Sequence, residues 1–397
     1  MLIIRKNLSL LVMLAGAAAQ LAGSLLLYKL MAPAQYGLYA LFITFLSVVF
    51  SFGLLGAEQT FMRTCSIKDG RITINKNLVI LLFICFLMGP AVLVLISSLV
   101  FMQAFSFIEL YLVAIAAVMV MFGYNYQRIS GRFVESQLIN NFWRLCILFS
   151  LLAGILIGFE FKTVAVWIVV GLIISSSFFL YRFFQEKNIE IVRSGSDAFF
   201  IVKLSLSFLF SMGVLTALSF FDRYLIGAKF DIEIFGNFFF LQNVFVHPFV
   251  LISNYIGFKG LVEYKKYFNV KEFNKKIIFL LVLMPIVSAA YVAIIFYFDQ
   301  VINLYFGFYS FFDLIIPLVV FGCIKLVYSY LSAAMGARGH AKNIFISNVV
   351  SGIFAFFMGV FLINVNVNIE TVAWSMVILW LIRCTAYYIG IRRSVVK

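Results

Sequence analysis

Long apolar runs, each about 20 residues in length, alternate with short polar connections along the whole chain. Such a run can cross a bilayer as a helix, because every backbone N–H and C=O group then finds its partner within the same segment. We therefore expect an all-α integral membrane protein. The pattern predicts twelve spans: Leu8–Leu27, Tyr36–Leu55, Leu78–Phe101, Phe107–Tyr126, Leu138–Ile157, Val164–Phe183, Val202–Phe221, Phe235–Tyr255, Ile277–Phe298, Phe311–Leu331, Ile344–Ile363 and Thr371–Ile389.

Basic residues mark one side of the predicted membrane. Most Lys and Arg residues lie in alternate connections, whereas the opposite connections hold only Lys29, Lys162, Arg223 and Lys229. Because short cytoplasmic loops are enriched in Lys and Arg, we expect both termini to lie in the cytoplasm and the number of spans to be even. The net charge of +14 is thus a topology signal, and we expect no nucleic-acid partner.

Composition leaves little room for a soluble catalytic domain. The 397 residues are 64% hydrophobic and 12% charged, whereas a soluble domain carries about 25% charged residues. The five cysteines have neither metal-ligand spacing nor the pattern of a disulfide framework, so we interpret them as small core residues. Since HExxH, Walker, GxSxG and DxD motifs are missing, we expect no enzyme, no catalytic residue, no cofactor and no metal site.

Charged side chains inside the spans are the candidate functional residues, because each costs about 2.5–3.5 kcal/mol at the centre of a membrane helix. Lys325 and Arg383 lie centrally in spans ten and twelve, and His247 lies beside a proline near the centre of span eight. We interpret them as a cationic patch that lines a polar cavity and receives an anionic group such as a diphosphate. The alternative is that they cap carbonyls or fix helix packing, or that Arg383 reaches toward the inner face.

Five further candidates lie nearer the ends of spans. Arg144 and Glu58 are expected near the cytoplasmic ends of spans five and two. Glu58 either pairs with Arg63 at the membrane edge or serves in a proton relay, and Arg144 either lines the cavity or anchors the inner face. Asp222 and Arg223 are expected to close span seven at the outer face as an interface pair. With these assignments no carboxylate lies in the middle of a span, which disfavours an exporter of cations.

A short element occurs twice in the chain. Residues 29–39 join the first two runs and are echoed by residues 227–238, and aligning Gly37 with Gly236 places aromatic residues opposite one another on both sides. We expect the element to turn the chain and its two tyrosines to anchor the second span at the membrane interface.

Two similar halves predict two lobes. The expected division is an N-terminal lobe at 1–184 with spans one to six, a cytoplasmic linker at 185–200, and a C-terminal lobe at 201–397 with spans seven to twelve. Internal repeats of this kind are typical of transporters whose substrate site lies at the interface of the repeats.

Two short motifs resemble those of a known family. Ala32-Pro-Ala-Gln-Tyr-Gly-Leu-Tyr-Ala40 resembles the GPxxYGxYA-type element of Wzx-type polysaccharide flippases of the MOP transporter superfamily, and Phe221-Asp-Arg-Tyr-Leu-Ile-Gly227 resembles their DRxxLG element. One departure is that residues 229–233 replace the usual glycine-containing connection. The resemblance implies two pseudo-symmetric six-helix lobes around a central cavity, as in MATE/MOP-like transporters. It also implies a flippase for undecaprenyl-diphosphate-linked oligosaccharide, an O-antigen or capsule repeat unit, that acts by alternating access in the bacterial inner membrane.

The same resemblance sets the expected partners. These are the lipid-linked oligosaccharide, membrane lipids, and the polymerase and chain-length proteins of the same pathway, and coupling to H⁺ or Na⁺ stays open. The alternatives are another MOP transporter, either a multidrug/cation antiporter or a peptidoglycan-precursor flippase, and an O-antigen polymerase or ligase. The last class needs a large outer loop, and the predicted outer loops are all short.

Overall fold

The computed structural model of the chain describes residues 2–68, 71–101, 105–185, 189–192, 198–301 and 306–395. Helices dominate these residues. They are α1 (Leu2–Leu30), α2 (Pro33–Phe52), α3 (Ala57–Thr64), α4 (Lys76–Phe101), α5 (Phe107–Ile129), α6 (Phe133–Ile157), α7 (Phe161–Phe184), α8 (Ala198–Lys229), α9 (Ile232–Phe245), α10 (His247–Lys266), α11 (Val270–Val301), the 3₁₀ turn η1 (Phe308–Phe311), α12 (Phe312–Arg338), α13 (Ala341–Asn364) and α14 (Ile369–Val395). Three short strands, β1 (Ser66–Lys68), β2 (Arg71–Asn75) and β3 (Ile189–Val192), complete the described elements.

The helices confirm the predicted membrane architecture. Among the described residues, eleven helical segments are long and apolar enough to cross a membrane, and α9 with α10 makes a twelfth if the bent pair is one span. This pair bends by 46°. The bend falls where Pro248, which lacks a backbone N–H, enters the first turn of α10.

The chain forms two compact units. Unit 1 comprises Met1–Thr216 and Asp231–Gly236, and unit 2 comprises Ala217–Phe230 and Asn237–Lys397. The division lies inside α8, whereas the sequence placed it in the linker at 185–200, of which 186–188 and 193–197 lie outside the described residues. The first half of α8 belongs to unit 1 because its backbone packs closely on the chain near Gly56.

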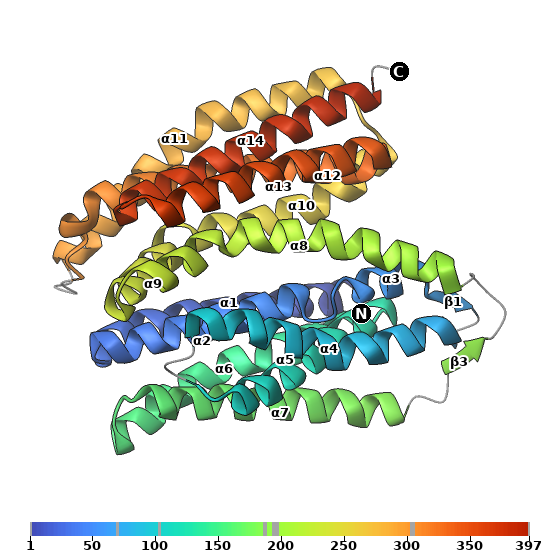
Figure 1. The fold of residues 1–397 in the computed structure, drawn as a ribbon, viewed down its shortest axis with the longest axis horizontal. Coiled ribbons are helices and arrows are strands. Elements are labelled where there is room, and N and C mark those ends of the chain that lie inside the picture. The colour runs from blue at the N-terminus through green and yellow to red at the C-terminus, as the bar shows by residue number, and fades with distance from the viewer. Residues whose placement is uncertain are drawn as a thin grey trace. The chain divides into compact units, whose positions relative to one another are not determined.

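In unit 1, α6 is the central helix and contacts α1, α5 and α7 (Figure 1). Small residues permit these close approaches, as is common between membrane helices. A Cβ atom on Gly171 of α7 would lie 2.7 Å from the Cα of Trp143 on α6. At one end of the same pair, Arg182 of α7 forms an ion pair of 2.7 Å with Glu135 of α6.

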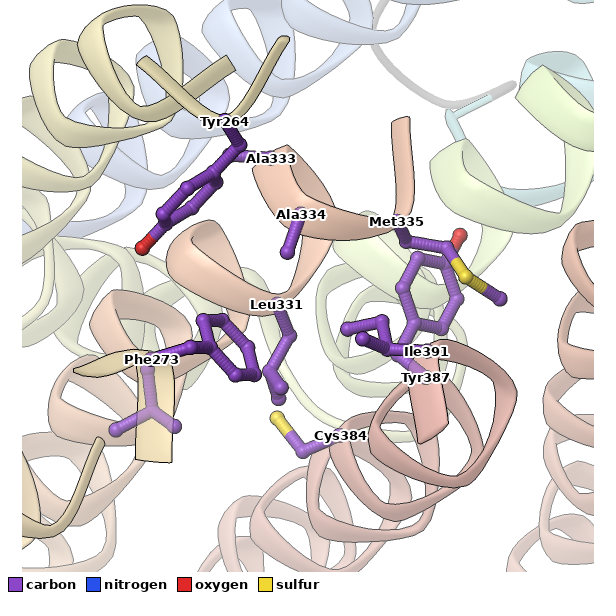
Figure 2. Close-up of a cluster of buried hydrophobic side chains, with 10 residues drawn as sticks. Tyr264, Phe273, Leu331, Ala333, Ala334, Met335, Cys384, Tyr387 and Ile391 are labelled. Atoms are coloured by element: carbon purple, nitrogen blue, oxygen red, sulfur yellow. The ribbon is translucent and has the colours of Figure 1, made fainter. Parts of the chain in front are cut away.

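In unit 2, α12 is the central helix and contacts α10, α11 and α14, while α13 packs on α14. A cluster of buried side chains surrounds the C-terminal half of α12, which ends at Arg338. In this cluster, shown in Figure 2, Leu331 and Met335 of α12 lie beside Tyr387 and Ile391 of α14. Phe273 of α11 joins the same cluster. The five cysteines are free and buried or partly buried, as expected of small core residues.

The second span is longer than predicted and broken. Leu55 and Gly56 have φ angles of 51° and 80°, and this left-handed backbone separates α2 from α3. The chain continues beyond the break as the short helix α3, so the apolar segment extends from Pro33 to Thr64.

A small sheet was not predicted from the sequence. β1 pairs with β2 antiparallel, with Ile67 opposite Ile72, and β2 pairs with β3 parallel, with Ile74 opposite Ile191. Isoleucines alternate with polar residues in 71–75 and 189–192, which is the period-two pattern of strands. Each run is too short to stand out as a strand signal in a chain dominated by long apolar runs.

The two tyrosines of the repeated element are buried, so the prediction that they anchor α2 at the membrane interface is wrong. Tyr36 and Tyr39 are 1% and 0% exposed. The hydroxyl of Tyr36 lies 2.8 Å from that of Ser24, on α1. The element therefore ties α1 to α2 from inside the protein.

The two glycines that the repeat aligned pack against each other. A Cβ atom on Gly236 would lie 3.1 Å from the Cα of Gly37, and one on Gly37 would overlap the carbonyl oxygen of Ile232. Both glycines belong to unit 1, where the start of α9 lies directly on the start of α2.

Candidate functional site

The eight candidate residues divide between the units. Unit 2 holds Asp222, Arg223, His247, Lys325 and Arg383, and unit 1 holds Glu58, Arg63 and Arg144.

Asp222 and Arg223 are interior residues and do not close the seventh span at the outer face as predicted. α8 continues about two turns beyond them to Lys229, and Asp222 is 1% exposed. Gln242 of α9 bridges the pair, because its amide Nε2 donates to Asp222 Oδ2 and its Oε1 accepts from Arg223 Nε at 2.8 Å. Asp222 Oδ1 has no hydrogen-bond partner among the described residues.

Aromatic rings hold the Arg223 guanidinium in place. Its central carbon lies 5.5 Å from the ring centroid of Phe220 and 5.2 Å from that of Phe239. A planar cation over aromatic ring faces is stabilised by the quadrupoles of the rings as well as by the nearby Asp222 carboxylate.

Lys325 lies near the middle of α12, as the sequence predicted. Its ammonium group is 4.8 Å from the ring centroids of both Phe321 and Trp380. The side chain is partly exposed, and it makes no hydrogen bond to any residue that the structure describes. It interacts electrostatically with Asp222 and Arg223, so the predicted site residues of spans seven and ten lie in one neighbourhood.

Arg383 is buried among polar and aromatic side chains, and the prediction that it lines a cavity stays a prediction. It is 2% exposed and lies among α12, α13 and α14. Its Nη2 donates to Asn348 Oδ1 at 3.3 Å and to the Tyr387 hydroxyl at 3.2 Å, and its guanidinium lies 5.1 Å from the Tyr328 ring centroid. Nε and Nη1 have no hydrogen-bond partner among the described residues. These contacts link α12, α13 and α14 and are those expected of the helix-packing role that the sequence interpretation kept as the alternative.

His247 lies at the bend between α9 and α10 and is partly exposed. Pro248 follows it in the first turn of α10. The position therefore lies at a 46° bend between two apolar helices, a kind of site where polar groups and free backbone carbonyls occur together.

Arg144 lies near the middle of α6, because that helix starts at Phe133 and not at Leu138. The expectation that it lies near the cytoplasmic end of the span is wrong. Its Nη1 donates to Asn141 Oδ1 at 3.0 Å, and its Nε has no partner among the described residues. Unit 1 thus has its own cation inside a span.

Glu58 and Arg63 do not form the predicted pair. Glu58 is 2% exposed at the start of α3, and its Oε2 has no hydrogen-bond partner in the part of the chain that the structure describes. Arg63 is exposed at the end of the same helix. Glu58 and Asp222 are both buried inside membrane-spanning segments. Neither lies in the middle of its segment, as the sequence predicted, but both are buried, which weakens the sequence argument against cation exporters.

Several partners of these charges were not among the predicted site residues. Gln242 and Asn348 supply the bridging oxygens, and Trp380 and Tyr328 supply the rings. The available signal was that Gln242 and Asn348 are amides within long apolar runs, where a polar side chain needs a partner.

Comparisons with known proteins give the fold. No protein-family model matches the chain, and no curated protein matches its sequence. An inward-facing structure of a multidrug resistance MATE family transporter of the MOP superfamily matches with a TM-score of 0.63 and 16% identity over 95% of this chain and 93% of that chain. The lipid II flippase MurJ in an inward closed conformation matches with a TM-score of 0.67 and 13% identity over 97% of this chain and 87% of that chain. An outward-facing structure of a multidrug resistance MATE family transporter matches with a TM-score of 0.56 and 16% identity over 97% of this chain and 94% of that chain. The chain shares the fold of these transporters, which confirms the predicted MATE/MOP-like architecture.

Proposed function

We propose that this chain is a flippase that moves an undecaprenyl-diphosphate-linked oligosaccharide, an O-antigen or capsule repeat unit, from the cytoplasmic to the periplasmic leaflet by alternating access. It acts in the bacterial inner membrane with both termini in the cytoplasm. The fold shared with a lipid II flippase supports this proposal. The resemblance of residues 32–40 and 221–227 to Wzx-type flippases supports a glycan as the cargo.

The observation that carries the proposal is the state of Lys325. An ammonium group inside a membrane helix is costly, and this one has aromatic rings around it but no hydrogen-bond acceptor among the described residues. Its three N–H donors fit the oxygens of an anionic group. A diphosphate would supply those acceptors and form charge-assisted hydrogen bonds in a low-dielectric setting.

The neighbouring residues have positioning roles in this proposal. Gln242 fixes Asp222 and Arg223 relative to each other, and Phe321 and Trp380 limit the positions of the Lys325 ammonium. Arg223 adds a second positive charge close to Lys325, which Asp222 offsets in part. The cluster therefore keeps a net positive charge for an anionic headgroup.

The test is the leaflet location of undecaprenyl-linked sugar units in cells that lack this protein. The proposal expects single units trapped on the cytoplasmic face, and wild-type protein restores surface glycan. Lys325→Ala lowers surface glycan at least tenfold while the amount of the variant protein in the membrane is unchanged. Lys325→Arg keeps part of the activity. Lys162→Ala changes an exposed control lysine and behaves as wild type. Unpolymerised units on the periplasmic face would point instead to a polymerase or ligase, and unchanged glycan would reject the proposal.

A second candidate is a multidrug/cation antiporter, and a specific observation favours it. Glu58 and Asp222 are buried carboxylates inside membrane spans, and each has one oxygen without a hydrogen-bond partner among the described residues. Such oxygens suit a transported cation or a coupling ion, H⁺ or Na⁺. The fold likeness to MATE transporters is comparable to that to the flippase. If cells that lack this protein lose drug efflux but keep normal surface glycan, the antiporter candidate is favoured over the flippase.

A further inference from the structure

The ring of Trp380, a residue of α14, lies against two parts of the polar interior of unit 2. Trp380 is 3% exposed, and the Lys325 ammonium lies 4.8 Å from the centroid of its ring. The Tyr328 ring centroid lies 4.9 Å from that of Trp380, at an interplanar angle of 87°. The Arg383 guanidinium in turn lies 5.1 Å from the centroid of Tyr328. A continuous series of side-chain contacts therefore leads from Lys325 to Arg383.

The two rings along this series give the two cations different surroundings. Arg383 donates to the oxygens of Asn348 and Tyr387. Lys325 instead has ring faces beside it and no hydrogen-bond acceptor among the described residues. Oxygen acceptors that serve one cation would also attract a second cation in a low-dielectric interior. An aromatic ring stabilises a cation through its quadrupole but leaves the N–H donors of an ammonium group unused.

A carbonyl group of α8 fixes the orientation of the Trp380 ring. The indole Nε1 donates to the backbone oxygen of Leu218 at 3.4 Å. Leu218 is buried and belongs to unit 2, as Trp380 does. It lies about one helical turn before Asp222, which interacts electrostatically with Lys325. One face of α8 therefore acts both on Lys325 and on the ring that packs against it.

We propose that Trp380 is a positioning residue for Lys325. Held by the Leu218 carbonyl, its ring keeps the Lys325 ammonium away from the oxygens that serve Arg383. The three N–H donors of the ammonium then stay available to the anionic group of the cargo. A small aliphatic side chain in place of the ring lets the flexible lysine turn toward those oxygens. This role rests on the proposed function, in which Lys325 binds the cargo, and Trp380 acts through Lys325 without touching the cargo.

Binding of farnesyl diphosphate, a short prenyl diphosphate, to the purified full-length protein tests this role by isothermal titration calorimetry. Wild type binds the diphosphate more tightly than farnesol. Trp380→Phe keeps a ring but loses the indole N–H, and it weakens diphosphate binding about threefold. Trp380→Leu removes the ring and weakens this binding about tenfold, while farnesol binding is unchanged in both variants. Trp374→Phe makes the same exchange at an exposed position of α14 and binds as wild type does.

A double-mutant cycle separates positioning of Lys325 from a merely structural role. Lys325→Met weakens diphosphate binding, and adding Trp380→Phe to it weakens binding no further, because the ring then has no ammonium to position. Trp380→Phe and this cycle decide the outcome even where Trp380→Leu fails to fold.

Two results would refute different parts of the reasoning. Losses that add in the cycle, or normal binding by Trp380→Phe and Trp380→Leu beside weak binding by Lys325→Met, would overturn the role of Trp380 and leave the proposed function standing. Normal diphosphate binding by Lys325→Met would overturn both.

Discussion

Replacing Gly37 by alanine perturbs the closest backbone approach at the start of α2. The new Cβ would overlap the carbonyl oxygen of Ile232 and lie 2.7 Å from its Cγ1 and 2.9 Å from its carbonyl carbon. Real Cβ atoms essentially never come within 3.0 Å of such atoms. Since the obstacle is backbone, no side-chain rotation relieves it, and α2 and the start of α9 have to separate.

The expected cost is that of overpacking, about 1–3 kcal/mol. It opposes the gain of about 1 kcal/mol that alanine has over glycine in a helix. Two matched substitutions separate these effects. In Gly213→Ala of α8 the new Cβ lies 3.5 Å from the Phe52 ring, an ordinary contact, so this variant keeps the favourable helix propensity of alanine. Gly236→Ala meets Gly37 at 3.1 Å and lies between the two cases.

The assay is the temperature at which half of the detergent-solubilised protein is lost from the monodisperse peak after heating. We expect Gly213→Ala to be at least as stable as wild type, Gly236→Ala to be lower, and Gly37→Ala to be lowest. Each kcal/mol corresponds to about 2–4 °C in a chain of 150–250 residues, so the fall for Gly37→Ala should amount to several degrees or less in this longer chain. If Gly37→Ala and Gly213→Ala have the same midpoint temperature, the close packing of the starts of α2 and α9 is refuted.

Two other predictions concern buried polar groups. Glu58→Gln keeps the shape of the side chain and removes a buried carboxylate, so we expect unchanged or higher thermal stability but at least tenfold lower ion-driven transport in proteoliposomes. Glu160→Gln, at an exposed position, is the control. Normal transport by Glu58→Gln would exclude a coupling role for Glu58. Asn348→Leu removes the acceptor of both Arg383 and Tyr387 and should destabilise unit 2 by about 1–3 kcal/mol in the same heating assay. Asn364→Leu on the exposed end of the same helix should cost far less, and equal losses would show that the Arg383 network contributes nothing.

Hydrophobicity by itself determined most of the architecture. A run of about 20 apolar residues has one stable arrangement in a bilayer, so the long apolar helices of the described residues could be predicted from the sequence without any knowledge of contacts. The central positions of Lys325 and Arg383 followed in the same way, because a charge far from both ends of an apolar run must lie inside the membrane. The repeat aligned Gly37 with Gly236, but such an alignment predicts no contact, and only the structure shows that the two glycines touch.

Tertiary structure decided what each charge contacts and how deeply it is buried. Helix ends depend on turns and packing and not on hydropathy, so α8 runs past Asp222 to Lys229 and α6 begins before the apolar run that contains Arg144. Hydrogen-bond partners lie far away in sequence, as Gln242 does from Asp222 and Asn348 from Arg383, and no local pattern encodes such a pairing. The sequence thus determined which segments are long and apolar enough to cross a membrane, because that depends on the composition of each segment alone. Only the packing of distant segments decided which charges are satisfied and which remain available to a ligand.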